Sequence, residues 1–243
     1  MDNSPAEKRL TQFLNFPSII ASHQIIENPQ NTGFGAGCNL GAARARGEIL
    51  FFLNPDCVFQ GGSFAAIISR LENDEKIGAI GPKLIDSNGR VEFSWSSFPS
   101  IWAEAKLKFE KILSGRVPPI QMKIEARFEK ARDVDWLTGG AFFMRHSTFD
   151  EIGGFDERFF LYFEDADLCK RINQTGYLTC YDPSFTLIHD RGGSIEESGE
   201  VVAESYRRSQ VLYYQKHKNP LSRMALGIYL HLTKRYPSKP IGS

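Results

Sequence analysis

Short apolar runs alternate with amphipathic stretches in the first half of the chain. Ile49–Leu53 is a continuous apolar run, which is typical of a strand buried on both faces. A helix is expected over Ser63–Leu71 and another strand over Ile77–Gly81. This alternation favours an α/β domain with a mostly parallel sheet.

The segment before these elements carries helix and turn signals. Ser4-Pro5-Ala6-Glu7 is a capping box with proline at the first helical position. A β-rich run, Ile19–Ile26, follows it, and the glycine-rich turn Asn31–Gly37 then leads to a helix around Asn39–Arg46. Because Cys38 stands where G-x-G-x-x-G needs its last glycine, the turn does not fit a dinucleotide site, and the Walker pattern is absent too.

The second half of the chain has a less regular pattern. A run resembling a strand, Val134–Met144, is interrupted by Gly139-Gly140. A helix is expected over Glu164–Gln174, with Gly176 as its C-terminal cap. The remaining expectations are a hairpin turn at Asp86–Gly89, a helical insertion at 96–132, strands at Tyr177–Tyr181 and Phe185–Ile188, and helix from about Val201 onward.

Composition is that of a soluble globular protein. The 243 residues are 42% hydrophobic and 24% charged, which excludes disordered, collagen-like and coiled-coil classes. No C-x-x-C pair occurs among Cys38, Cys57, Cys169 and Cys180, so structural zinc spacing is absent and a reducing compartment is expected. The sequence predicts neither a signal peptide nor a membrane-spanning segment.

The formal charge is zero, with 29 basic and 29 acidic residues, which argues against a nucleic-acid partner. The charges are unevenly distributed, since the segment from Ser205 onward holds eight Lys or Arg and no Asp or Glu. Apolar positions lie among these basic residues: Val211, Leu212, Leu226, Ile228, Leu230 and Leu232. The pattern fits a helix lying on an anionic membrane surface, and a solvated basic face is an equal alternative.

Polar groups follow the most apolar strand. Asn54-Pro55-Asp56 comes directly after Ile49–Leu53, and ligands bind beyond the carboxyl ends of strands in open α/β sheets. Asp56 could hold a divalent cation that bridges two phosphates. The alternative is a simple turn.

Three carboxylates open the helix at Glu164. Glu164, Asp165 and Asp167 suit a helix N-terminus by the helix dipole alone, but one of them could act as a general base. His189 ends a strand and is either a structural residue or a metal ligand. Trp136, near Gly139-Gly140, is either a core residue or a flat platform for a sugar ring.

Taken in order, these pieces resemble the family 2 glycosyltransferases of the GT-A fold, and most of all bacterial rhamnosyltransferases of cell-surface polysaccharide synthesis. The resemblance covers about residues 1–217. The matching segments are Asp2-Asn3-Ser4, Asn31–Gly41, Phe52–Asp56, Trp136–Ala141, Gly153–Asp156, Glu164–Leu168 and His189.

The resemblance implies roles for individual residues. Asp165 corresponds to the catalytic base. The implied nucleotide-sugar contacts are Asp2, Asn39, Asn54 and Asp56, the acceptor contacts are Trp136, Gly139 and Glu164, and the metal ligands are Asp56 and His189. The implied cofactor is a divalent cation, Mg²⁺ or Mn²⁺. The implied reaction is inverting transfer of a sugar, rhamnose from dTDP-rhamnose, to a hydroxyl of a glycan or polyprenyl-linked acceptor.

The sequence departs from the family pattern in two places. Asn54 replaces the first aspartate of the metal motif. Met1 stands directly before Asp2, so roughly 30–40 residues of the family pattern, about one strand-helix unit, have no counterpart. We therefore expect a GT-A domain over 1–200 without its first strand-helix unit, and a basic amphipathic helical tail over 201–243.

Two other functions compete with this one. A truncated domain could bind nucleotide or a partner without turnover. A nucleotidyltransferase is less favoured, because Asn31–Gly41 contains no Lys or Arg to hold a triphosphate. The expected location is the cytoplasm, with peripheral contact at the cytoplasmic face of the inner membrane.

Overall fold

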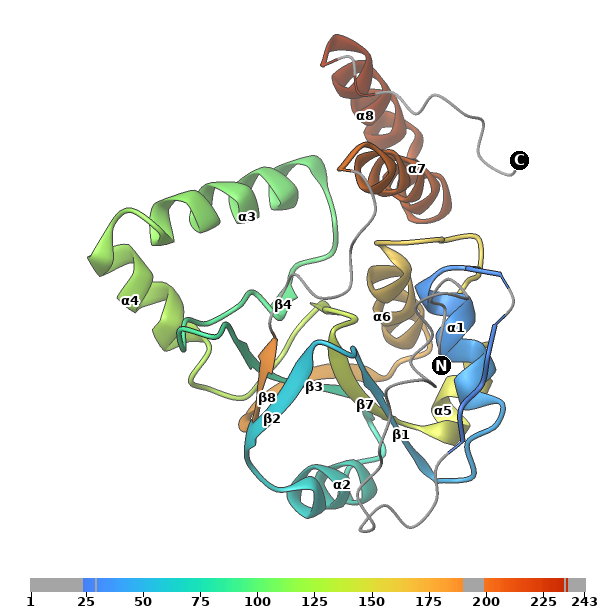
Figure 1. The fold of residues 1–243 in the computed structure, drawn as a ribbon. Helices are drawn as coiled ribbons and strands as arrows, with labels where there is room; N and C mark the ends of the chain where they lie inside the picture. The colour runs from blue at the N-terminus through green and yellow to red at the C-terminus, as the bar shows by residue number, and fades with distance from the viewer. Residues whose placement is uncertain (1–23, 29, 190–198, 234, 236–243) are drawn as a thin grey trace.

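The computed structural model describes residues 24–28, 30–189, 199–233 and 235 (Figure 1). The helices of this part are α1 Phe34–Ala42, α2 Phe64–Asn73, α3 Ile101–Ser114, α4 Pro118–Arg127, α5 His146–Glu151, α6 Glu164–Gln174, α7 Gly199–His217 and α8 Pro220–Leu232. Its strands are β1 Ile49–Leu53, β2 Cys57–Gly61, β3 Ile77–Ile85, β4 Trp95–Ser96, β5 Arg132–Asp133, β6 Trp136–Leu137, β7 Ala141–Arg145 and β8 Leu178–His189.

The larger sheet has the strand order β1-β7-β3-β8-β2, with β5 also paired to β8. The expectation of a mostly parallel sheet is wrong for the described strands. Only β3 and β8 pair in parallel there, whereas β1–β7, β3–β7, β2–β8 and β5–β8 are antiparallel. The strand-helix-strand unit from β1 to β3 does keep those two strands in one direction, but β7 lies between them and runs the opposite way. A local hydrophobic pattern does not reveal that insertion.

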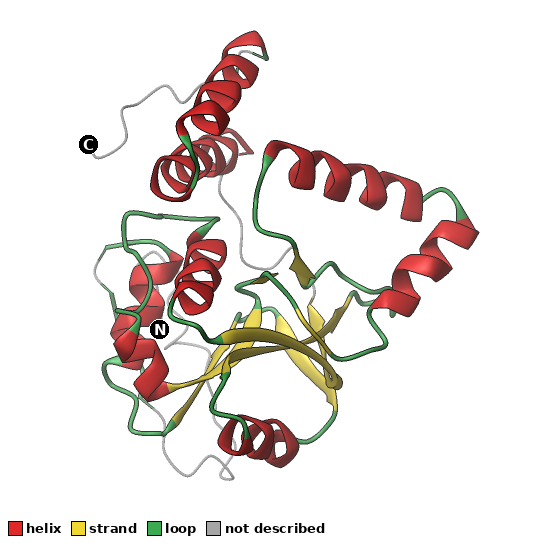
Figure 2. Ribbon diagram, turned by 180° about the vertical axis from the view of Figure 1, so that it is seen from behind, coloured by secondary structure: helices red, strands yellow, loops and turns green. Residues whose placement is uncertain are grey.

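Helices cover both faces of this sheet (Figure 2). On one face, apolar residues of α2 share a cluster with Ala141 and Phe143 of β7. Phe142 and Met144, which alternate with them, belong to a cluster on the other face with residues of α1, α5 and α6. Because successive strand side chains point to opposite faces, β7 is buried on both, which accounts for its unbroken apolar sequence.

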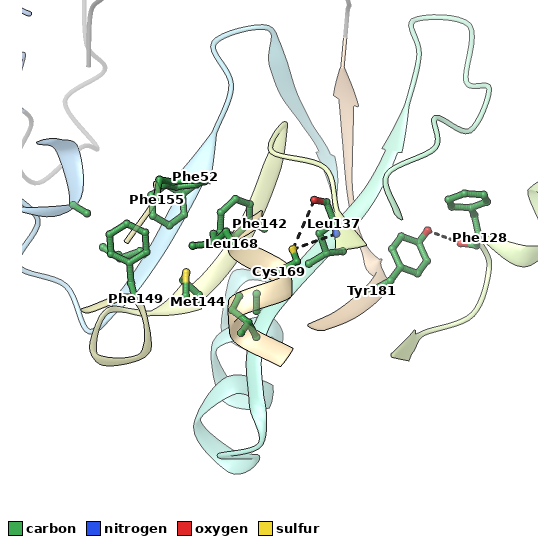
Figure 3. Close-up of a cluster of buried hydrophobic side chains, with 14 of the residues drawn as sticks. Phe52, Phe128, Leu137, Phe142, Met144, Phe149, Phe155, Leu168, Cys169 and Tyr181 are labelled. Carbon is green, nitrogen blue, oxygen red and sulfur yellow. Dashed lines mark hydrogen bonds between the residues drawn. The ribbon is translucent and has the colours of Figure 1, made fainter. Parts of the chain in front are cut away.

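Aromatic rings lie on both sides of Cys169 in the core cluster that α6 helps to form (Figure 3). The rings of Phe52 and Phe142 stack with centroids 4.7 Å apart, and Phe155 meets Phe52 edge-on at 5.5 Å. Cys169 of α6 lies in the same cluster, where the backbone N–H of Leu137 donates to its sulfur over 3.4 Å. Burial raises the pKa of Cys169 to about 12, so this residue stays a thiol and acts as packing between α6 and β6.

A third cluster joins the C-terminal helices to the start of α6. It contains Phe159 and Phe163 from the segment before α6 and Tyr213 from α7. Side chains from both sides of residue 200 therefore share one core, and the domain boundary at that point stays a prediction. None of the helices in the described ranges has both the length and the apolar character needed to cross a bilayer.

For some helices and strands both predicted boundaries agree with the structure, and for others the predicted boundaries differ from it. β1 and α6 have the predicted bounds. The apolar run Val134–Met144 is instead divided into β6 and β7, with Gly139-Gly140 in the gap. α1 begins earlier than expected, because Gly33, with φ of 93°, makes the turn that precedes it. The two strands expected before His189 form one strand, β8.

Candidate active site

The ends of β1 and β8 bring three ligand-type side chains together. The turn Asn54-Pro55-Asp56 joins β1 to β2, and the antiparallel register of β2 and β8 sets Cys57 opposite His189. Asp56 Oδ1 lies 3.3 Å from His189 Nε2. One ligand atom each of Asp56, Cys57 and His189 lies within 4.8 Å of the others. The structure thus places Asp56 beside His189 and adds Cys57, which the sequence analysis did not single out.

Glu92 holds the second ring nitrogen of His189. Glu92 Oε2 lies 2.9 Å from His189 Nδ1, and the histidine side chain is only 8% exposed. A hydrogen bond from Nδ1–H to this carboxylate leaves Nε2 as the ring atom that faces Asp56. The backbone N–H of Glu92 donates to the carbonyl of Leu84 over 2.9 Å, so the segment after the turn at Asp86–Gly89, which bridges back to Ile85 at Val91, positions Glu92. No local pattern in the sequence predicts that Glu92 lies beside His189.

A strained turn sets the start of α6. Tyr162 and Phe163 have φ values of 68° and 66°, a left-handed region that such bulky residues rarely adopt. Phe163 is buried in the third cluster, and this burial offsets the backbone strain. The chain then enters α6 with the Glu164 side chain turned into the protein, where the residue is 5% exposed.

Backbone donors hold the Asp165 carboxylate. The N–H of Gly139 donates to Oδ2 over 2.8 Å, and the N–H of Ala166 donates to Oδ1 over 2.7 Å. Burial raises the pKa of Asp165, and these two donors oppose that rise. The carboxylate predicted as the general base is therefore both buried and held by two backbone donors, and its catalytic role stays a prediction.

Glu164 has a different environment from its neighbour. Burial, followed by the charge of Asp165, raises the pKa of Glu164 well above its usual range. Within the part of the chain that the structure describes, Glu164 Oε2 accepts no hydrogen bond. Two adjacent carboxyl groups with such unequal support favour a protonated Glu164 beside an ionised Asp165.

Gly139 and Gly140 lie between the Asp165 carboxylate and the ligand cluster, which consists of Asp56, Cys57 and His189. Gly139 binds Asp165 through its N–H, and a Cβ at Gly139 would lie 3.5 Å from the Asp165 Cβ. A Cβ at Gly140 would lie 3.5 Å from His189 Cε1. The buried carboxylate of α6 and the ligand cluster therefore lie on either side of a two-residue backbone segment.

Asn54 closes the turn that carries Asp56. Its N–H donates to the carbonyl of Gly140 over 2.9 Å, and its own carbonyl accepts from the N–H of Cys57 over 3.1 Å. The side-chain Oδ1 of Asn54 is buried and makes no hydrogen bond to another described residue. This amide oxygen is thus available as a weak, uncharged ligand at the same turn.

The remaining predicted site residues have more varied positions. Trp136 is half-buried and packs against two core clusters, so it serves as core whether or not it also contacts a sugar. Asn39 donates to the carbonyl of Phe155 over 2.9 Å and accepts from the N–H of Phe155 over 2.8 Å. Both ends of its amide are therefore engaged within the protein, and its nucleotide contact stays a prediction. Asp2 lies outside the described residues.

Asp167, one of the three carboxylates considered as a general base, is instead the anchor of α6. It is fully buried and contacts Arg171 Nε at 2.8 Å, Lys216 Nζ at 2.7 Å and His217 Nε2 at 2.6 Å. Burial raises the pKa of Asp167, but the hydrogen bond from His217 and the charges of Arg171 and Lys216 outweigh it, so the pKa lies below its ordinary value. Two of the three partners come from α7, which only the tertiary fold brings near.

Comparison with known proteins identifies the family. The model of glycosyl transferase family 2 matches residues 15–153, more than half of the chain. The chain belongs to glycosyl transferase family 2. The family match and the mixed α/β sheet confirm the predicted GT-A fold. The matched span includes Asp56 and Gly139 and ends before Asp165 and His189, so the roles of those last two stay predictions.

Two relatives of this family member are rhamnosyltransferases. N-acetylglucosaminyl-diphospho-decaprenol L-rhamnosyltransferase of Mycobacterium tuberculosis (strain ATCC 25618 / H37Rv) is 30% identical over 166 residues, which is 68% of this chain and 54% of that protein. Rhamnosyltransferase WbbL of Escherichia coli (strain K12) is 43% identical over 56 residues, 23% of this chain and 21% of that protein. The chain thus spans about half the length of the mycobacterial relative.

A likeness also exists among solved structures. GalNAc-T7, solved with UDP, GalNAc and Mn²⁺, superimposes with a TM-score of 0.49 at 17% identity, over 88% of this chain and 46% of that chain. At this level of superposition, the family assignment rests on the sequence matches.

Proposed function

We propose that this family 2 protein transfers a sugar, rhamnose from dTDP-rhamnose, to a hydroxyl of a glycan or polyprenyl-linked acceptor, with inversion at the anomeric carbon, in cell-surface polysaccharide synthesis. One observation carries the proposal. The buried carboxylate of Asp165 is bound by the N–H of Gly139, and the next residue, Gly140, lies against His189 of the Asp56–His189 pair. The two rhamnosyltransferase relatives support the choice of sugar.

Asp165 performs the proton transfer in this proposal. Its carboxylate accepts the proton of the acceptor hydroxyl while that oxygen attacks the anomeric carbon, and the nucleoside diphosphate leaves with the electrons of the broken bond. The N–H groups of Gly139 and Ala166 orient the carboxylate for this step. General-base assistance of this kind is worth roughly 10²–10⁴ in rate.

Asp56 and His189 would hold the divalent cation, Mg²⁺ or Mn²⁺. The carboxylate oxygen of Asp56 is a ligand type that Mg²⁺ and Mn²⁺ prefer, His189 Nε2 lies 3.3 Å from it, and the buried Oδ1 of Asn54 lies in the same turn. When bound, such an ion neutralises charge on the departing diphosphate. Glu92 fixes the ring of His189 in the required orientation.

Peripheral contact with an anionic membrane surface would bring the enzyme to a lipid-linked acceptor. α8 has no acidic residue in its sequence. One face of this helix consists of strongly exposed apolar side chains, Leu221, Met224, Ile228 and Leu232. This face differs from the one expected from the sequence, because Leu212, Leu226 and Leu230 are buried in the core.

α3 carries a second face of the same kind. Trp102 is 85% exposed and Phe109 is 61% exposed, and Lys106, Lys108 and Lys111 are exposed on the same helix. The two acidic residues of α3 are engaged, Glu104 by Tyr206 and Gln210 and Glu110 by Arg127. Both views place α3 and α8 at the same end of the molecule, away from α2 (Figures 1 and 2).

The test of the proposed function compares Asp165→Asn with Asp150→Asn, a control on an exposed carboxylate (73% exposed side chain). Transfer from radiolabelled dTDP-rhamnose to polyprenyl-diphospho-N-acetylglucosamine is measured alongside dTDP affinity. We expect the Asp165 variant to lose at least about 10²-fold in turnover with unchanged dTDP affinity, and the control to keep both. Wild-type turnover in Asp165→Asn would contradict the assignment. Binding of dTDP without any transfer by the wild-type chain would favour a binding domain instead.

A further inference from the structure

Cys57 occupies a position that the proposed reaction does not use. It begins β2, directly after Asp56, and the register of β2 and β8 pairs it with His189. Its sulfur, an oxygen of Asp56 and a ring nitrogen of His189 all lie within 4.8 Å of one another. In the described part of the chain, this is the group of three such side chains that could hold one metal ion.

The donor set differs from one built for a hard cation. Mg²⁺ prefers oxygen ligands throughout, whereas a thiolate sulfur and an imidazole nitrogen select borderline metals such as Zn²⁺ and Co²⁺. In a tetrahedral site with bonds of about 2.0–2.3 Å, ligand atoms are separated by roughly 3.3–3.8 Å. The 3.3 Å between Asp56 Oδ1 and His189 Nε2 already falls in that range.

The surroundings also resemble those of a built metal centre. Metal-bound histidines usually donate their second ring N–H to a carboxylate, which fixes the ring, and Glu92 takes this position 2.9 Å from Nδ1 of His189. The side chains of Asp56 and His189 are 10% and 8% exposed, so the cluster is sheltered. Three protein ligands leave a fourth position open, as in catalytic zinc sites.

We propose that Asp56, Cys57 and His189 form a three-ligand centre that binds a thiophilic divalent cation, Zn²⁺, Co²⁺ or Cd²⁺, through the Cys57 sulfur. The inference rests on the proposed function only in sharing Asp56 and His189 with its cation site. A thiophilic ion would compete with Mg²⁺ or Mn²⁺ for Asp56 and His189, and the Cys57 sulfur would favour the thiophilic ion in that competition.

Cobalt serves as the probe, because a cysteine sulfur bound to Co²⁺ gives a near-ultraviolet charge-transfer absorption that oxygen and nitrogen ligands do not give. We expect the full-length protein to show this absorption on titration with Co²⁺ and Cys57→Ser to lose it. Cys38→Ser is the matched control. Burial raises the pKa of Cys38 to about 12, so that thiol stays protonated and its loss leaves the absorption intact.

A second measurement uses the unmodified chain, in case Cys57→Ser fails to fold. Cd²⁺ should protect a single thiol from alkylation, and peptide mapping should locate it at Cys57. The proposal is overturned if the wild-type protein gives no sulfur-to-cobalt absorption, if Cys57→Ser retains it, or if protection maps to another cysteine. Asp165→Asn should keep the absorption, so a failed sugar transfer with an intact cobalt spectrum rejects the proposed function and leaves this centre standing.

Discussion

Glu164 and Asp165 are consecutive carboxyl groups with opposite tasks. Two backbone N–H groups support the charge of Asp165, whereas Glu164 is buried beside that charge. Of the two groups, the site therefore favours the protonated form more strongly at Glu164 than at Asp165. Separation of two neighbouring carboxyl groups by environment is how one site can hold both an acid and a base at the same pH.

The pH dependence of transfer should reflect this division. Because burial raises the pKa of Asp165, the rate should rise with pH through a midpoint above the usual aspartate value of about 3.9. Glu164→Gln mimics the protonated side chain, so we expect it to keep the rate and leave that midpoint in place. The measurement is a pH profile of kcat for both proteins. A large loss of kcat in Glu164→Gln would mean that the ionised form of Glu164 is needed.

At the scale of elements, α6 is fixed from two directions. The left-handed pair Tyr162 and Phe163 sets its first turn, and α7 holds it laterally through Lys216 and His217 on the buried Asp167. Lys216 also contacts Asp156 at 2.6 Å, which extends the connection to the loop before α6. The C-terminal helices are therefore part of the support of the site.

Asp167→Asn should lower the free energy of unfolding by about 3 kcal/mol, because it leaves the largely buried guanidinium of Arg171 without its charged partner. The control is Glu129→Gln, which removes the charge of Glu129 from its more exposed salt bridge with Lys83. It should lower the free energy of unfolding by less than about 1 kcal/mol. Denaturant unfolding of both variants and the wild type measures the difference. An equal effect of the two substitutions would contradict the anchoring role.

The cost of Asp167→Asn should also depend on pH. The pKa of Asp167 is lowered in the folded protein, so its ionised form contributes stability in full above the unfolded pKa of about 3.9. That contribution is lost as pH falls through the lower, folded pKa. The gap between wild type and variant should thus be constant near neutral pH and close in strong acid.

For the whole molecule, zero net charge conceals a basic C-terminal region whose cations have two different uses. Lys216 is engaged inside the protein by Asp156 and Asp167. Arg223 and Arg235 are instead exposed, on α8 and just beyond it. The basic tail expected from the sequence therefore divides into an internal clamp and an external surface.

The external surface gives a prediction about membranes. The double variant Met224→Ser, Ile228→Ser should bind anionic phosphatidylglycerol vesicles roughly tenfold less tightly, because withdrawing two large apolar side chains from the interface costs about 1.5 kcal/mol or more. Val58→Ser, on the sheet-edge strand β2 and 59% exposed in the wild type, is the control and should bind as before. Co-sedimentation measures both. If vesicle affinity does not change with the α8 substitutions, or with the content of anionic lipid, α8 is not the membrane-contacting surface.

Local signals in the sequence predict the parts of the site that depend on local structure. The apolar run of β1 followed by Asn54-Pro55-Asp56, and the acidic first turn of α6, are visible in consecutive residues. Glu92 and Asp167 acquire their importance from partners 97 and 50 residues away. The insertion of β7 between β1 and β3 is likewise a matter of strand pairing. Long-range pairing of this kind leaves no periodic trace in one sequence.

The glycine pair between β6 and β7 has a consequence for how spacing is maintained. Asp165 is tied to the N–H of Gly139, and His189 lies against Gly140. Consecutive Cα atoms are about 3.8 Å apart, a length fixed by covalent bonds. Of the path between the proton acceptor and His189, the Gly139–Gly140 step is therefore fixed by covalent bonds, and only the two non-covalent contacts at its ends can vary.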